Sequence, residues 1–304
     1  MAQNVPSDEK MSRYISLLTD FGFKRIFGEE ANKDLLIDFL NAVLNIDGGI
    51  KKLEYGNPEK QGRVKTDAKA IFDLYCTTGK GERIIIEMQK LPQKYYKDRA
   101  LYYSTFPIQE QGEKRKRWNF MLHPVFSVNI VNFILDKDAD IPEDEYISYI
   151  ELRYRNRNRI FYDKLSFVFL ELPRFTKSIN ELQTNVERWM YVLRYMHQLD
   201  DIPATLLRNR IFKKLFEKAE IANMTKQEIT AYNHSLKRAR DMDMAKIEIR
   251  ERDKTIAIMS KEIVAKENAI AAKDNAIAAQ AAKIAEYEQK YGILNPSLQT
   301  FPVQ

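Results

Sequence analysis

Cysteine and long apolar runs are both scarce in this chain of 304 residues. The single cysteine, Cys76, excludes a framework of disulfide bonds within the chain and is typical of proteins in a reducing cytoplasm. No apolar run approaches the roughly 20 residues that a membrane-spanning helix requires, and the first residues lack the apolar core of a signal peptide. The sequence therefore predicts a cytoplasmic protein with no membrane partner.

The sequence also lacks the motifs of several common enzyme classes. Its three histidines, His123, His197 and His234, lie far apart and have no cysteine or acidic pair at the spacing of a zinc site. There is no Walker loop, no dinucleotide-binding glycine pattern after a strand, and no nucleophile elbow of a serine hydrolase. Zinc chemistry, nucleotide hydrolysis and serine-based acyl transfer therefore have no support in the sequence.

The most informative segment that is present spans residues 68–90. Two β-rich runs flank Gly79-Lys80-Gly81, which is a turn signal, so this segment is predicted to form a hairpin. If the two strands pair symmetrically about Lys80, Asp73 lies directly opposite Glu87. The hairpin would then bring together two acids that are distant in sequence.

An amide completes this candidate site. Side chains alternate along a strand, so Glu87 and Gln89 share one face. Two carboxylates, from Asp73 and Glu87, and the Gln89 amide oxygen suit a hard divalent cation, Mg²⁺ with Mn²⁺ as a substitute. The alternative is that both acids lie on a solvated face and bind nothing. Apolar runs beside both acids favour strands that are buried on both faces, where a carboxylate requires a partner.

The remaining pattern predicts an α/β fold with a mixed sheet flanked by helices. Helices are expected over residues 32–44, 180–199 and 204–218, and a further helix begins within residues 92–103. Strands are expected at residues 50–55, 125–135, 146–155 and 165–171. Trp189 is expected to pack in the core of the helical part.

Six short segments carry a further signal: TDFGFKRIFG (19–28), NKDLLIDFLNAVL (32–44), AIFDLYC (70–76), IIIEMQK (84–90), KDRALYYSTFPIQEQ (97–111) and FLELPRF (169–175). With Asp73 and the triplet Glu87-Met88-Gln89, they resemble the PD-(D/E)XK nuclease superfamily. The local sequence resembles its transposase-like branch, the Rpn family of recombination-promoting nucleases and transposases. The resemblance implies a restriction-endonuclease-like core, Mg²⁺-dependent DNA cleavage, and a link to recombination or mobile elements. It also implies that Asp73, Glu87 and Gln89 are catalytic, the two acids as metal ligands.

The chain departs from the superfamily pattern at Gln89, where the motif usually has lysine. A neutral amide cannot stabilise negative charge or handle a proton as a lysine can. A second interpretation therefore stays open, namely a nuclease-fold module that binds DNA or protein without cleaving. A transposase that also joins strands ranks last, because the sequence has no strand-transfer constellation. Asp67 and Asp34 are weaker candidates for supporting acids.

The net charge of +6 permits contact with nucleic acid without requiring it. The candidate DNA-contacting residues are Lys94, Lys97, Arg99, Lys114, Arg115, Lys116 and Arg117. A further group alternates along the chain: Arg153, Arg155, Arg157 and Arg159. Alternation would place these four guanidinium groups on one face if the segment is extended. The alternative for each run is a solvated surface, and the group that follows Gln89 is the best placed to contact DNA phosphates.

Glycine and proline are absent between Pro203 and Gly292, and a long helix is predicted from about residue 225 to residue 291. Apolar residues recur in it every seven positions: Met242, Ile249, Ile256, Ile263, Ile270, Ile277 and Ile284. This period predicts a left-handed coiled coil that joins copies of the chain into a homo-oligomer. The column three residues further on is mostly polar, so a solvated helix is the alternative.

These observations divide the chain into four predicted parts. Residues 1–175 form the nuclease-like domain and residues 176–224 a helical subdomain. Residues 225–291 form the long heptad-repeat helix, and residues 292–304 are expected to be a disordered tail.

Overall fold

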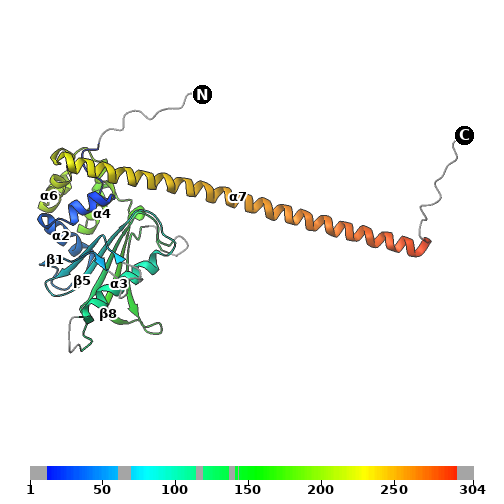
Figure 1. Cartoon of the computed structure of the whole chain (residues 1–304), viewed down its shortest axis with the longest axis horizontal. Coiled ribbons are helices and arrows are strands. Elements are labelled where there is room, and N and C mark those ends of the chain that lie inside the picture. Colours follow the sequence, from blue (N-terminus) through cyan, green and yellow to red (C-terminus); the bar gives the residue numbers. More distant parts are fainter. Residues whose placement is uncertain (1–11, 61–69, 114–118, 137–140, 143, 293–304) are drawn as a thin grey trace, which may run out of the picture. The chain divides into compact units, whose positions relative to one another are not determined.

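The computed structural model describes residues 12–60, 70–113, 119–136, 141–142 and 144–292. The chain divides into two units, residues 1–242 and residues 243–304. The first unit contains the sheet and the short helices, and the second consists of the continuation of the last helix (Figure 1). Within the described ranges, no helix combines the length and the apolar character that crossing a membrane requires.

A mixed six-stranded sheet forms the centre of the first unit. Its strands in spatial order are β1 (Leu53–Tyr55), β4 (Leu74–Thr78), β5 (Arg83–Gln89), β6 (Val125–Val131), β8 (Ile160–Glu171) and β7 (Ile147–Arg153). Strands β5, β6 and β8 run parallel, whereas β1, β4 and β7 pair antiparallel with their neighbours. The short strands β2 (Glu59–Lys60) and β3 (Ala70–Ile71) pair separately. This topology confirms the predicted α/β fold with a mixed sheet.

Helices cover both faces of the sheet (Figure 1). Ile84 and Ile86 of β5 belong to the main core, which also contains buried residues of α1 (Asp20–Phe27), α2 (Lys33–Val43), α4 (Asn185–Tyr195), α5 (Ala204–Leu207) and α6 (Arg210–Ala219). Trp189 is fully buried in this core, as expected. Ile85 faces the other way and packs beneath α3 (Tyr96–Glu113). The hairpin strand is therefore buried on both faces, as its apolar run predicted.

Local contacts explain where the helices begin and end. α4 begins at Asn185, later than predicted, because Thr184 and Glu187 form a capping box there. α3 begins at Tyr96, within the predicted residues 92–103, and continues to Glu113, and its Tyr103 and Phe106 pack against the sheet. The capping box thus gives α4 a later start than the hydrophobic pattern alone predicts.

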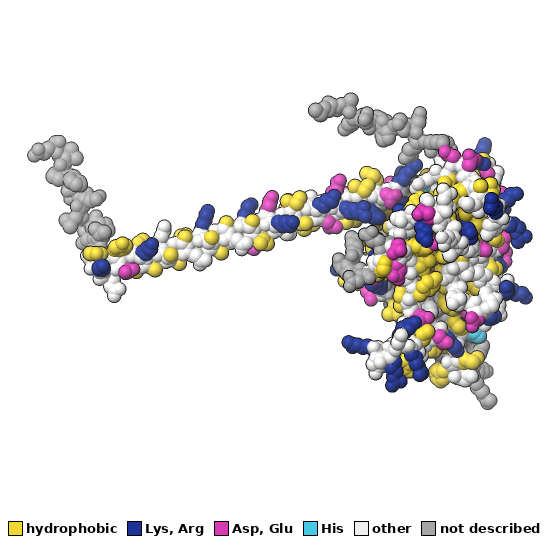
Figure 2. All heavy atoms as spheres, turned by 180° about the vertical axis from the view of Figure 1, so that it is seen from behind, with side chains coloured by type: hydrophobic (Ala, Val, Ile, Leu, Met, Phe, Trp, Pro, Cys, Tyr) yellow, Lys and Arg dark blue, Asp and Glu magenta, His cyan; other side chains and the backbone are white. Residues whose placement is uncertain are grey.

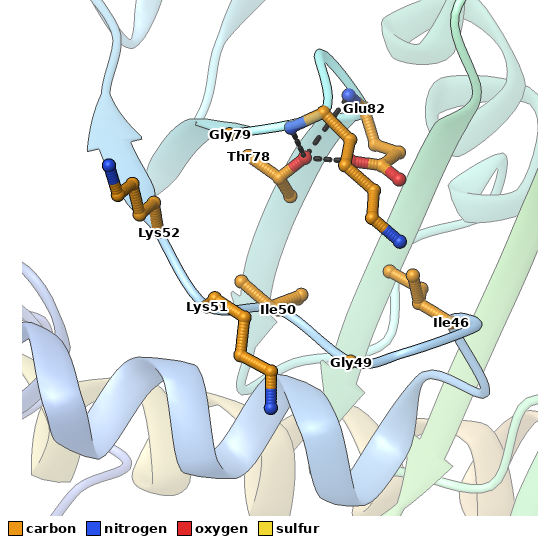
Figure 3. A pocket seen from close by; sticks show the side chains of 9 residues that line it. Ile46, Gly49, Ile50, Lys51, Lys52, Thr78, Gly79 and Glu82 are labelled. Carbon is orange, nitrogen blue, oxygen red and sulfur yellow. Dashed lines mark hydrogen bonds between the residues drawn. The ribbon is translucent and has the colours of Figure 1, made fainter.

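The turn of the hairpin is closed by side chains as well as by glycine (Figure 3). Thr78 Oγ1 accepts hydrogen bonds from the backbone N–H groups of Lys80, at 3.3 Å, and Glu82, at 3.2 Å. The Thr78 hydroxyl also donates to the carboxylate of Glu82. Gly81 has a φ of +91°, and a Cβ there would lie 2.8 Å from His123 Nδ1, so both the conformation and the space require glycine. A small cavity of 220 Å³ lies at this turn, and its lining includes Thr78, Lys80 and Glu82, whose hydrogen bonds stabilise the turn.

The last helix, α7 (Lys226–Tyr291), is continuous over 66 residues, as predicted. Thr225 precedes it, and its backbone N–H and hydroxyl both donate to the carboxylate of Glu228. In the second unit, apolar side chains recur along the helix between charged ones (Figure 2). Ile249 is 55% exposed and Ile277 is 63% exposed, so the heptad column lies on the surface of the single chain. The coiled coil stays a prediction.

The segment that carries the alternating arginines is not extended throughout. β7 ends at Arg153, and residues 154–159 form a turn in which the Tyr154 N–H donates to the Arg159 carbonyl at 3.1 Å. The guanidinium groups of Arg157 and Arg159 both lie 5.5 Å from the centre of the Tyr154 ring. The condition for one shared face, an extended segment, is not met, because the chain reverses direction between β7 and β8.

Candidate active site

The hairpin forms with the register that the sequence predicts. Leu74 pairs with Ile86 across β4 and β5, so Asp73, one residue before β4, lies opposite Glu87. The backbone N–H of Asp73 donates to Glu87 Oε1 at 3.3 Å, and the backbone N–H of Met88 donates to Asp73 Oδ2 at 2.7 Å. Each acid is therefore anchored by the strand that carries the other.

Burial makes both acids hard to ionise. Glu87 is 6% exposed, and burial, followed by the charge of Asp73, raises its pKa to about 8. Burial also raises the pKa of Asp73, although the hydrogen bond from Met88 opposes that shift. The nearby charge of Arg99 favours the ionised form of both acids. A pair of this kind is stabilised strongly by a cation that approaches both carboxylates.

The metal-free protein should lose stability as the pH rises from about 5 to about 9. The folded state keeps a proton on Glu87 up to a pKa of about 8, whereas the unfolded chain releases it near the ordinary value of 4.5. The folded state binds more protons in this window, so the stability due to Glu87 is present below pH 4.5 and is lost as the pH rises through 8.

Thermal denaturation in the presence of a chelator measures this decline. Glu87→Gln should show a smaller decline over the same window, because an amide at this position has no proton to lose. Equal slopes for the two proteins would show that Glu87 does not titrate with a raised pKa.

Arg99 of α3 contacts Glu87 of this pair. Its Nη2 lies 3.2 Å from Glu87 Oε2 and 2.9 Å from Gln89 Oε1, and it donates to both. The guanidinium also lies over two aromatic rings, 5.0 Å from the centre of Tyr96 and 5.4 Å from that of Tyr103. The sequence predicted Arg99 as a DNA contact, and the structure places it against the acidic side chains.

Glu87 and Gln89 reach the same guanidinium, so they share the α3 side of the sheet as predicted. Met88, between them, packs against the main core on the opposite side. The Gln89 amide is held at both ends, because its Nε2 donates to the Leu91 carbonyl at 3.0 Å while its oxygen accepts from Arg99.

A cavity of 420 Å³ opens beside Asp73. Its lining includes Thr19, Asp20, Gln89, Lys90 and, from the first turns of α7, Arg238. Asp20 was not predicted as a site residue. It lies in the first turn of α1, pairs with Lys24 at 2.8 Å, and its charge helps to raise the pKa of Asp73.

The other predicted residues lie elsewhere or beyond the described ranges. Asp34 accepts from Lys214 at 2.5 Å, on the contact between α2 and α6. Lys97 pairs with Asp136 at 2.5 Å, and Lys94 lies exposed, 5.2 Å from the centre of the Tyr95 ring. The residues outside the described part of the chain are Asp67, Lys114, Arg115, Lys116 and Arg117.

The donors present suit Mg²⁺ bound in part by solvent and substrate. Among the described residues, no group of three or more histidine, cysteine, aspartate or glutamate side chains could enclose a metal ion. Mg²⁺ is usually held by one or two carboxylates together with waters and substrate phosphates, and does not need an all-protein cage. Asp73 and Glu87, hard oxygen donors with a strong need for a counter-charge, fit that mode of binding.

A mixed sheet with helices on both faces, and a hairpin that presents Asp73 beside the Glu87-Met88-Gln89 triplet, define a protein of the PD-(D/E)XK class. The family model for the PD-(D/E)XK nuclease family transposase matches residues 17–248, and the chain belongs to this family. The match runs from the start of α1 into α7 and supports a nuclease-like or transposase-like function. No curated protein and no solved structure matches the chain.

Proposed function

We propose that this protein is a Mg²⁺-dependent DNA endonuclease that hydrolyses phosphodiester bonds in recombination or in the movement of mobile elements. The observation that carries the proposal is the pair of half-buried Asp73 and buried Glu87, each anchored on the other's strand. Asp73 lines an open cavity, and the cation of Arg99 contacts Glu87. Mn²⁺ is expected to replace Mg²⁺, because it accepts the same oxygen donors.

The two carboxylates would hold the ion, with the Gln89 oxygen as a further donor or as a group that orients water. A bound Mg²⁺ would polarise the scissile phosphate and lower the pKa of a water nucleophile. The backbone N–H groups of Asp73 and Met88 fix the carboxylates before substrate arrives, so little reorganisation is needed. Asp20, on the rim of the cavity, is the best-placed additional acid for orienting water.

Cleavage of a supercoiled plasmid tests this function. The protein should convert the plasmid to nicked or linear DNA with Mg²⁺ or Mn²⁺, and the products should be absent with a chelator. At low protein concentration the rate should fall as salt rises, because contacts to phosphates release counterions. Intact plasmid with both metals, at protein concentrations that bind DNA, would refute the endonuclease.

The rival function is a module that binds DNA or protein without cleaving it. Gln89 in place of the usual lysine favours this rival, as does the contact between Arg99 and Glu87, which occupies one oxygen of that acid. The two functions differ in whether the site takes up a divalent ion at all.

We also propose that the second unit associates with a second copy of the chain. Its isoleucine column is exposed along its length, and charged residues flank the column on both sides. On one flank, four residues after Ile249, Ile263 and Ile270, lie Asp253, Glu267 and Asp274. On the other flank, three residues after the same isoleucines, lie Arg252, Lys266 and Lys273. In a parallel pair, each flank meets the opposite flank of the partner, so acids face bases, whereas an antiparallel pair would place like charges together.

Sedimentation of the full chain at several concentrations measures this association. The wild type should have the mass of two chains, and the double variant Ile263→Asp/Ile270→Asp should have the mass of one. The matched control is Ile258→Asp/Val264→Asp, which places two aspartates at exposed positions outside the column and should remain paired. A monomeric wild type, or equal dissociation in both variants, would rule out the column as the interface.

A further inference from the structure

Strand β5 lacks the positive charge that a lysine usually supplies at the last position of the family motif. Gln89 occupies that position with a neutral amide whose oxygen and nitrogen are both engaged, by Arg99 and by the Leu91 carbonyl. The amide is therefore fixed in orientation and cannot itself stabilise negative charge as a cation would.

We infer that Arg99 of α3 supplies this charge, so that the cation of the motif has moved from the strand to the helix that covers it. The inference rests on the proposed nuclease function. Arg99 Nη2 donates to Gln89 Oε1 at 2.9 Å and to Glu87 Oε2 at 3.2 Å, which places the guanidinium against the motif position and against one of the two acids.

The surroundings of Arg99 hold it in this place. Its Nη1 donates to Gln93 Oε1 at 2.6 Å, and its guanidinium lies against the rings of Tyr96 and Tyr103. Tyr96 is itself buried, and its hydroxyl donates to Asn129 Oδ1 at 3.0 Å in the neighbouring strand β6. A charge that is held in advance in this way stabilises a developing negative charge without the cost of ordering a side chain.

Two basic side chains, Lys90 and Arg238, line the cavity, whereas Arg99 lies outside its lining, against Glu87 and Gln89. Lys90 Nζ donates to the Ala239 carbonyl at 2.8 Å, and Lys24 pairs with Asp20 at 2.8 Å. Within the described part of the chain, Arg99 is the cation that forms an ion pair with Glu87. A guanidinium has five N–H donors, so the three hydrogen bonds to Glu87, Gln89 and Gln93 leave donors for a phosphate oxygen.

An arginine in this role differs from a lysine in one chemical respect. The guanidinium stays protonated at all working pH values, so it can stabilise negative charge on the phosphate but cannot give or take a proton. Arg99 would therefore supply electrostatic stabilisation alone, and the proton for the departing oxygen would come from water.

Three variants test the inference by single-turnover cleavage: Arg99→Met, Arg99→Lys and the double variant Gln89→Lys/Arg99→Met. Arg99→Met should slow cleavage by about 10²–10³-fold, as expected for the loss of one fixed stabilising group. Arg99→Lys should retain part of the rate because it keeps the charge. The double variant, which returns a cation to the strand position, should regain at least about tenfold over Arg99→Met. Arg188→Met, which removes a half-buried guanidinium from α4, is the control for the loss of an arginine.

A second readout separates this role from a structural one. Calorimetric titration with Mn²⁺ should show that Arg99→Met binds the ion at least as tightly as the wild type, because a cation that competes for Glu87 is gone. Added guanidinium ion should raise the cleavage rate of Arg99→Met but not that of the wild type. If that variant unfolds, Arg99→Lys and the double variant give the same comparison.

The outcomes are distinct. If the wild type cleaves DNA and Arg99→Met cleaves it at the same rate, the inference is wrong but the proposed nuclease function is not. The same holds if the double variant cleaves no faster than Arg99→Met. A wild type that does not cleave with either metal overturns both.

Discussion

Asp73→Asn should reduce metal-dependent DNA cleavage by at least about a thousandfold while the protein stays folded. The asparagine side chain has the same shape, and its oxygen can still accept the hydrogen bond that Met88 N–H donates to Asp73 Oδ2 at 2.7 Å. What it lacks is the negative charge that a divalent ion requires. Single-turnover cleavage of a labelled duplex measures the loss of rate. A thermal melt of the same preparation shows whether the protein stays folded.

The thermal melt should show equal or higher stability in the variant. Burial raises the pKa of Asp73, which means that the folded protein carries this charge at a cost. The matched control is Asp34→Asn, because Asp34 is a half-buried acid that pairs with Lys214 outside the cavity. Cleavage at the wild-type rate by Asp73→Asn, or an equal loss in both variants, would exclude Asp73 as a metal ligand.

Removing both acids should abolish binding of the divalent ion. The wild type should bind one Mn²⁺ per chain in a calorimetric titration, and Asp73→Asn/Glu87→Gln should bind at least about a hundredfold more weakly. At pH 7 binding should also release close to one proton, because Glu87 has a pKa of about 8 and must be ionised to hold the ion. Titrations in two buffers with different heats of ionisation count that proton.

The same titration separates the enzyme from the rival binding module. The proton count should fall towards zero by about pH 9, where Glu87 is already ionised in the metal-free protein. A wild type that takes up no Mg²⁺ or Mn²⁺ at millimolar concentration would favour the module. Equal Mn²⁺ binding by the wild type and the double variant would show that the metal site lies elsewhere than at the hairpin.

The hairpin could be predicted from the sequence because its determinants are local. The glycines at positions 79 and 81 mark the turn, and the alternation of side chains fixes which residues share a face. Leu74 pairs with Ile86 in the structure, which is the register that symmetry about Lys80 requires. The continuous α7 followed in the same way from the absence of glycine and proline.

The surroundings of the acids could not be predicted in this way. Arg99 reaches Glu87 because α3 lies over that face of the sheet, and no local pattern states which helix covers which face. Asp20 comes close to Asp73 from a separate element, and an acid directly after the capping residue Thr19 has the ordinary explanation of a favourable helix start.

The turn at residues 154–159 has a signal in the sequence. Asn156 and Asn158 alternate with the arginines, and asparagine favours turns because its side chain hydrogen-bonds to nearby backbone. The chain reverses there, between β7 and β8, and Arg157 and Arg159 both lie beside the Tyr154 ring.

A crystal structure of the protein soaked in Mn²⁺ tests most directly whether Asp73 and Glu87 bind one metal ion together. The anomalous signal should locate one ion within about 2.2 Å of a carboxylate oxygen of Asp73 and of one from Glu87. Crystals that diffract well and place manganese only at other residues, or that keep both carboxylates in their present hydrogen bonds with no ion between them, would contradict a shared metal site.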